Sequence, residues 1–210
     1  MHLVVLGAAG GVGRHVVRLA AERGHTVTAV ARRPGADAHA SRWVIGDVRN
    51  TAVVTPLLPG AAAVLWCVGV TKSSGGQVGR TALPPLVSAM TEYGVPRFVG
   101  VSGAGADLPG DRKGLGARVI SGLTHRLGRD LVEDKEGEHR ALAASGLDWT
   151  QVRPPRLVDR PGTGRYTLTG DAPGLRARPV SKADVALAML DLAESRTWLA
   201  AAPFVVDPGK

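Results

Sequence analysis

The chain has 210 residues, of which 44% are hydrophobic and 21% charged, and its formal net charge is +8. This length suits one well-filled domain over residues 1–210, and the absence of a long apolar run or a charged-then-apolar leader predicts a cytoplasmic protein without a membrane partner. Cys67 is the only cysteine, which excludes an internal disulfide and thiolate metal clusters, so that no metal is expected.

The positive charge permits a nucleic-acid partner, but the basic residues are scattered, apart from one concentration at residues 112–129. Neither a zinc-finger spacing nor an aromatic RNA-binding signature accompanies them, so we do not expect nucleic acid as the partner. Alanine, glycine and arginine are abundant and only five basic residues are lysine. This bias is typical of a GC-rich bacterial genome, which accounts for part of the basicity.

Strands and helices alternate along the first half of the chain, and the predicted strands are short apolar runs of the kind that sheets bury on both faces. In chain order the expected elements are a strand at 2–7, a helix at 11–23, strands at 26–32 and 42–48, a helix at 52–60, a strand at 62–70, a helix at 82–95 with prolines in its first turn, and a strand at 97–105. The alternation predicts an α/β fold, a doubly wound Rossmann-type parallel sheet.

The pattern loosens after residue 105, where glycines and charges predict a mobile surface loop. The later elements expected are a helix at 127–144, a strand that runs into a turn at 148–158, an edge strand or hairpin arm at 164–170, a helix at 182–194 capped by Ser181, and a last strand at 203–208. We therefore expect a small C-terminal substrate lobe on the single domain, with the substrate-side elements mainly from 105–130 and 153–180.

A glycine-rich turn, GAAGGVG, follows the first strand and opens the first helix. Glycines three apart let the chain turn sharply, let a diphosphate approach the backbone and let the helix pack on the sheet, because each task excludes a β-carbon. This context favours a dinucleotide site over an empty tight loop. The cofactor-binding residues predicted here are Gly7, Ala9, Gly10, Gly11, Val12 and Gly13.

The second strand ends in Arg32 and Arg33, without an acid beside them. An acid at this strand end binds the ribose 2′-hydroxyl of NAD, whereas a 2′-phosphate prefers arginine, which pairs with it through fork-shaped, charge-assisted hydrogen bonds. NADP(H) is therefore the predicted cofactor, with NAD(H) the weaker alternative. The other interpretation of the two arginines is a solvated strand end.

A family resemblance rests on the spacing Gly-x-x-Gly-x-x-Gly, on GDV at 46–48, on VGVSGAG at 99–105 and on the stretches HRALAASGLDWTQVRPPRLVDRPGTGRYTL and VSKADVALAMLDL. Over most of its length the chain resembles the atypical short-chain dehydrogenases/reductases, which include the NADPH-dependent flavin reductase/biliverdin reductase B family and the NmrA-like proteins. The combination is specific for the family and much less so for a substrate.

The resemblance implies roles for residues at the ends of the later strands. Asp47 would hydrogen-bond the adenine amino group, with Val48 beside it. The adenosine and ribose would lie against Cys67, Val68 and Gly69, and the nicotinamide against Val101, Ser102 and Gly103, while Pro154, Pro155 and Arg156 would wall the nicotinamide and substrate pocket. Gly103 and Arg156 are thus the predicted substrate contacts; Arg156 would attract an acidic substrate or, alternatively, form a surface ion pair.

The sequence departs from the family at its catalytic tyrosine. Ordinary members use Tyr-x-x-x-Lys, in which the lysine lowers the phenol pKa so that the tyrosine can transfer a proton. Lys135 falls near the lysine position, but Leu131 stands where the tyrosine would be. Ser102 and Lys135 remain as catalytic candidates, the alternatives being a strand-end serine that bonds its own backbone and a solvated helix lysine.

These observations predict an NADPH-dependent oxidoreductase that transfers hydride to a flat conjugated small-molecule acceptor, such as a flavin or quinone. Such an acceptor can take its proton from water, so no tyrosine acid is needed. The alternative is an NmrA-like redox sensor that binds NADP(H) without turnover and uses the basic 112–129 region as a partner surface. The sequence leaves monomer and dimer open.

Overall fold

The computed structural model describes residues 1–33, 35, 39–70, 76–106, 108, 129–174 and 177–209. A six-stranded sheet forms its centre, and every neighbouring pair of strands runs parallel, in the order β3-β2-β1-β4-β5-β6. The strands are β1 His2–Leu6, β2 Thr26–Ala31, β3 Arg42–Ile45, β4 Ala63–Trp66, β5 Arg97–Val101 and β6 Asp148–Val152. The strand order reverses between β1 and β4, which confirms the predicted doubly wound Rossmann-type fold.

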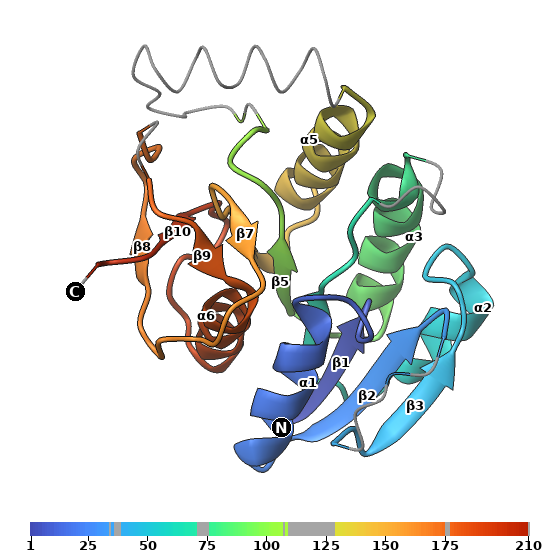
Figure 1. The fold of residues 1–210 in the computed structure, drawn as a ribbon. Helices are drawn as coiled ribbons and strands as arrows, with labels where there is room; N and C mark the ends of the chain where they lie inside the picture. The colour runs from blue at the N-terminus through green and yellow to red at the C-terminus, as the bar shows by residue number, and fades with distance from the viewer. Residues whose placement is uncertain are drawn as a thin grey trace.

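Helices cover both faces of this sheet (Figure 1). One face carries α1 Gly13–Glu22 and α6 Lys182–Glu194; the other carries α2 Thr51–Val54, the 3₁₀ helix η1 Thr55–Leu57, α3 Val78–Glu92 and α5 Arg129–Ala143. Successive side chains of a strand point to opposite faces. Leu3 and Val5 of β1 therefore join the core under α1 and α6, whereas Val4 and Leu6 join the core under α3 and α5. This two-sided burial explains the uninterrupted apolar runs.

The start of α3 differs from the prediction, which placed Pro84 and Pro85 in the first turn of a helix at 82–95. The helix begins at Val78, so both prolines lie inside it. Its first turn is held by the Asp134 carboxylate of α5, which accepts hydrogen bonds from the amides of Gly79 and Arg80 at 3.1 and 2.8 Å. This tertiary cap lets the helix begin upstream of the predicted start at residue 82.

The C-terminal elements pack beside α6, on the left of Figure 1. β7 Leu157–Val158 pairs in parallel with β9 Val180–Ser181, and β8 Thr167–Thr169 pairs antiparallel with β10 Phe204–Val206. The stretch 148–158 is a strand that runs into a turn, as predicted: β6 ends at Val152, and Pro154 and Pro155, which have no amide hydrogen for a ladder, follow it. The last strand, β10, forms a small sheet with β8. The outer edge of β6 is covered by the C-terminal part of the chain, through bridges of Thr150 with Ala201 and of Arg153 with Phe204.

Among the described residues, no helix is both long and apolar enough to cross a membrane.

Candidate functional site

A cleft of about 360 Å³ opens at the carboxyl ends of β1, β2, β3 and β4, beside the point where the strand order reverses. Open α/β sheets bind their ligands at this edge. The cleft is lined by Gly7, Ala9, Gly10, Val30, Ala31, Arg32, Arg33, Gly46, Asp47, Val48, Arg49, Cys67, Val68, Gly69 and Val78. Ten of the predicted cofactor residues are among them.

The glycine-rich turn is built so tightly that side chains cannot enter it. The amides of Gly7 and Ala8 both donate to the Val30 carbonyl at 3.0 Å, and Gly7 has φ +80°. A Cβ on Gly7 would lie 2.8 Å from the Cys67 carbonyl carbon, and one on Gly13 would collide with the Gly7 carbonyl oxygen. Both positions therefore require glycine, as the sequence predicted.

The first turn of α1 leaves hydrogen-bond donors available at this loop. The N-cap residue, Val12, supplies no side-chain bond. Within the described part of the chain, the amides of Ala9, Gly11 and Val12 donate to no residue. Unpaired amides at a helix N-terminus bind anions, because the helix dipole adds its positive end. The loop thus fits the diphosphate of a dinucleotide in both shape and charge.

Three arginines line the other end of the cleft. Arg32 and Arg33 follow β2, and Arg49, which the sequence analysis missed, follows β3. Arg49 lies two residues after Asp47 in the predicted motif, and this spacing was the signal that could have identified it. Together with Asp47, the one acid in the cleft lining, these side chains form an arginine-rich rim, and such a rim suits a phosphate.

Asp47 is already engaged in this rim. Its carboxylate accepts hydrogen bonds from the Arg49 guanidinium at 3.0 and 2.7 Å and from the Arg49 amide at 2.9 Å. The hydrogen bond from Arg49 is the main cause that lowers the pKa of Asp47 to about 2. Asp47 is therefore a carboxylate at every physiological pH, and its partner in the structure is Arg49.

Cys67 ends the cleft wall contributed by β4. Its amide donates to the Leu6 carbonyl at 2.8 Å, and its side chain is buried. Burial raises the pKa of the Cys67 thiol to about 12, so this thiol is a packing group and not a nucleophile. No group of three or more metal-ligating side chains was found among the described residues.

Lys135 lies beneath the carboxyl ends of β4 and β5. Its ammonium donates to the carbonyls of Val68 and Val101 at 3.1 and 3.4 Å and to the Glu138 carboxylate at 2.7 Å. The side chain is 8% exposed, so the alternative of a solvated helix lysine is wrong. These three bonds use all the hydrogens of the ammonium group, and Lys135 joins the two strand ends as a buried crosslink.

Ser102 follows β5 at the same edge. Its amide donates to the Val152 carbonyl at 2.9 Å, while its Oγ is buried and has no partner among the described residues. The alternative of a side chain bonded to its own backbone is therefore wrong. Ala104 donates to the Pro154 carbonyl at 3.2 Å, which keeps the segments after β5 and β6 together.

The remaining predicted residues lie outside the cleft. Val12 and Gly13 pack under the turn, and Val101, Gly103, Pro154 and Pro155 do not line it. Arg156 is exposed and forms no ion pair with the described residues, contrary to the alternative considered for it. Residues 109–128, which include most of the basic 112–129 region, lie outside the described residues.

A family model for NAD(P)H-binding proteins matches residues 7–196. The chain belongs to this NAD(P)H-binding family. The match confirms the resemblance to the atypical short-chain dehydrogenases/reductases and supports a nicotinamide cofactor for the chain. It spans the glycine-rich turn, both core faces and the C-terminal elements up to α6.

Solved structures share the fold over the whole chain. The anaerobillin reductase ChuY from Escherichia coli O157:H7 is 21% identical with a TM-score of 0.77, covering 100% of this chain and 98% of its own. The oxidoreductase ylbE from Lactococcus lactis is 20% identical, with a TM-score of 0.80 and coverages of 100% and 92%. A candidate NADH-flavin reductase from Streptococcus pneumoniae is 21% identical, with a TM-score of 0.78 and coverages of 99% and 99%. Likeness at this identity establishes the fold.

Proposed function

We propose that the protein is an NADPH-dependent reductase that transfers hydride to a flat conjugated acceptor, such as a flavin or quinone. The observation that carries the proposal is the lack of a phenolic acid at the ends of β5 and β6, where the nicotinamide is expected. Tyr93 is the C-cap residue of α3, and the hydroxyl of Tyr166 donates to Asp191 at 2.6 Å beneath α6. The chain has two tyrosines, so neither serves the site.

Lys135 does not replace the missing acid. All three ammonium hydrogens are directed at Val68, Val101 and Glu138, and the side chain is almost completely buried. A ketone needs a proton delivered to its oxygen as hydride arrives, whereas a flavin or quinone spreads the charge over its rings and can take the proton from water. The residues present therefore favour the conjugated acceptor.

The preference for NADPH rests on the arginine-rich rim. Arg32 and Arg33 are exposed at the end of β2, where guanidinium groups can form paired hydrogen bonds to a phosphate. Asp47, the acid nearest to them in the cleft lining, is neutralised by Arg49 at 2.7 Å. A ribose 2′-phosphate therefore meets net positive charge at this end.

The bound cofactor would supply the hydride from its reduced nicotinamide, and the protein would supply position. The glycine-rich turn holds the diphosphate, and Lys135 fixes the strand ends on which the nicotinamide half rests. Ser102, whose buried Oγ has no partner among the described residues, would donate or accept a hydrogen bond to the nicotinamide or the acceptor.

The test is the oxidation of NADPH by the purified protein with a panel of flavins and quinones, followed by the loss of absorbance of the reduced nicotinamide. NADH in place of NADPH, and a reaction without acceptor, are the controls. We expect turnover with several conjugated acceptors, faster with NADPH, and none with simple ketones. Tight NADPH binding without turnover on any acceptor would contradict a reductase and favour the NADP(H)-binding sensor.

A further inference from the structure

Three charged side chains from separate parts of the chain meet beside the glycine-rich turn. Asp159, which follows β7, accepts hydrogen bonds from Arg14 of α1 at 2.8 Å and from Lys182, the first residue of α6, at 2.9 Å. Asp159 is 58% exposed, and the two cations are 45% and 26% exposed. One carboxylate open to solvent thus holds two cations at the N-termini of two helices.

Lys182 lies directly on the turn. A Cβ built on Gly11 would be 2.9, 3.0 and 3.2 Å from Cδ, Cε and Nζ of Lys182. The lysine therefore occupies the space that a side chain at position 11 would fill, beside the backbone of Gly11. A larger residue at position 11 would displace the end of the Lys182 side chain from the turn.

The surrounding charges make this spot positive. His15, in the first turn of α1, has a pKa lowered first by its burial; Arg14, Arg18 and Lys182 lower it further, and Asp159 opposes them. A histidine resists protonation where the local potential is positive. Near Asp159 two cations, Arg14 and Lys182, thus share one carboxylate, and this excess of positive charge favours a bound anion.

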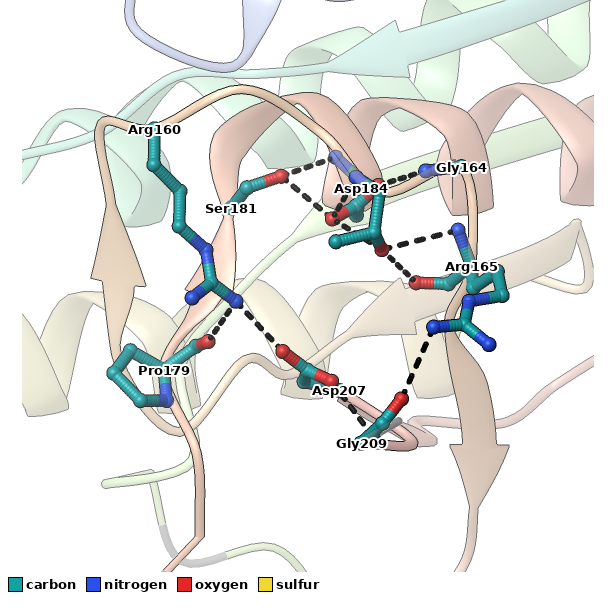
Figure 2. A network of polar contacts seen from close by, with 9 residues as sticks. Arg160, Gly164, Arg165, Pro179, Ser181, Asp184, Asp207 and Gly209 are labelled. Atoms are coloured by element: carbon teal, nitrogen blue, oxygen red, sulfur yellow. Dashed lines mark hydrogen bonds and ion pairs between the residues drawn. The ribbon is translucent and has the colours of Figure 1, made fainter.

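A second polar network fixes the two residues that carry the cluster (Figure 2). Ser181 caps α6, and its hydroxyl donates to Asp184 at 2.8 Å, while Asp184 accepts the amides of Thr163 and Gly164 at 2.8 and 2.9 Å. Arg160, next to Asp159, donates to the Pro179 carbonyl at 3.1 Å and to Asp207 at 2.6 Å. The residue after Asp159 and the residue before Lys182 are thus both held by side-chain hydrogen bonds.

We propose that Lys182 is a ligand of the diphosphate group of the dinucleotide, and that Asp159 holds its ammonium over the turn until the cofactor binds. The proposal rests on the proposed use of this cleft for NADPH and adds a residue to it. Asp159 and a phosphate are both anions that Lys182 can pair with, and the phosphate also receives the amides of the turn. The lysine would then exchange one partner for the other.

The experiment measures the dissociation constant for NADPH by titration of the protein's tryptophan fluorescence, without any acceptor. Lys182→Gln is expected to raise the constant by about tenfold, the usual loss for one charge-assisted hydrogen bond, and Lys182→Arg to recover most of it. Asp159→Asn, which releases the lysine from its competitor, is expected to lower the dissociation constant for NADPH. Competition with 2′-AMP, which lacks the diphosphate, should be insensitive to Lys182→Gln.

Arg18→Gln is the matched control, since it removes one charge from α1 where Arg18 pairs with Glu22 at 2.7 Å. Thermal unfolding of each variant separates a loss of binding from a loss of fold. If Lys182→Gln leaves the NADPH constant unchanged, or if Asp159→Asn weakens binding as much, the cluster is only a tether and the proposal is wrong. If the wild type does not bind NADPH, the proposed function fails first.

A phosphate group on the acceptor, such as that of FMN, is the other anion that Lys182 could bind. If Lys182 serves an FMN phosphate instead, Lys182→Gln raises the KM for FMN and not for riboflavin, while the NADPH constant stays that of the wild type. That result would overturn the assignment to the dinucleotide.

Discussion

Lys135 and Glu138 form an ion pair of 2.7 Å in which the side chains are 8% and 0% exposed. The same Glu138 oxygen accepts the indole N–H of Trp66 at 3.1 Å. Gly79 of α3 packs on this carboxylate so closely that a Cβ there would collide with it. The pair therefore joins α5 to the ends of two strands and to the first turn of α3, directly below the cleft.

Removal of Lys135 leaves the Glu138 carboxylate buried without its partner cation. Lys135→Met is expected to lower the free energy of unfolding by about 3–5 kcal/mol, because an unpaired ion in the core loses its Coulombic compensation. For a domain of this size the melting temperature should fall by roughly 10 °C. Addition of Glu138→Gln removes the second charge, so the double variant should be more stable than Lys135→Met alone. Additive losses in urea unfolding would show that the two residues do not interact.

The same variant should respond to pH in a predictable direction. Burial raises the pKa of Glu138, and Lys135 opposes that rise. Without the lysine, the folded state favours the protonated carboxyl even more strongly. A carboxyl with a raised folded-state pKa contributes stability at low pH, and that contribution is lost as pH rises through the folded value. The loss in free energy of unfolding caused by Lys135→Met should therefore be smaller in mildly acidic buffer and larger in alkaline buffer. The opposite trend in urea unfolding would contradict a buried Glu138 charge.

The glycine-rich turn predicts a sharp difference between two glycines. Gly13→Ala is expected to cost at least about 2 kcal/mol and to abolish measurable NADPH binding, because its Cβ collides with the Gly7 carbonyl oxygen. Gly170→Ala is the matched control, since a Cβ there meets no atom within 4 Å. Chemical denaturation and NADPH titration of both variants check this. Similar behaviour of the two would mean that the turn relaxes more easily than its contacts imply.

The arginine-rich rim predicts cofactor preference. Replacement of both Arg32 and Arg33 by serine should weaken NADPH binding by about 100-fold, because two charge-assisted contacts to the 2′-phosphate are lost. NADH, which has a hydroxyl at this position, should lose less than about threefold. The ratio of the two dissociation constants is the readout. Equal losses would assign the arginines to general attraction and not to the 2′-phosphate.

Cys67 should be inert in the folded protein. The thiolate is the reactive form, and a pKa raised to about 12 leaves very little of it at neutral pH. Iodoacetamide is expected to label the native protein far more slowly than the urea-unfolded protein, as followed by intact mass. Rapid labelling of the native protein would show that the end of β4 opens to solvent.

The sheet and the cofactor loop were predictable because each rests on local pattern. Apolar runs identified the six strands of the sheet, and the positive φ of Gly7 is what a glycine at that position signals. The start of α3 was not predictable, since its cap is Asp134 from a helix more than fifty residues later. Arg97 shows the same limit: its guanidinium is buried at 6% exposure and caps the C-terminus of α6 at the Leu192 carbonyl. A local sequence pattern cannot predict that an arginine is buried by a partner so far away in the chain.

The residues of the candidate site also differ in whether local sequence could predict them. Residues that follow a strand in sequence, such as Arg32 and Cys67, were found because parallel strands end at one edge. Lys182 was missed because it approaches the turn from the opposite end of the chain, and only the fold places it over Gly11. The burial of Lys135 also depends on Glu138, Trp66 and Gly79 together, which come from three different elements.

The C-terminal segment protects the sheet from unwanted association. The amides of Gln151 and Arg153 donate to the carbonyls of Ala201 and Pro203 at 3.0 and 2.9 Å, so the outer backbone of β6 is already paired within the chain. At the opposite margin, β3 offers four residues that begin with Arg42 and end with Ile45, which is 53% exposed. A short margin that starts with a charge is a poor template for a further strand. Among the described residues, β3 is therefore the edge of this sheet at which a second copy or an extended peptide could join.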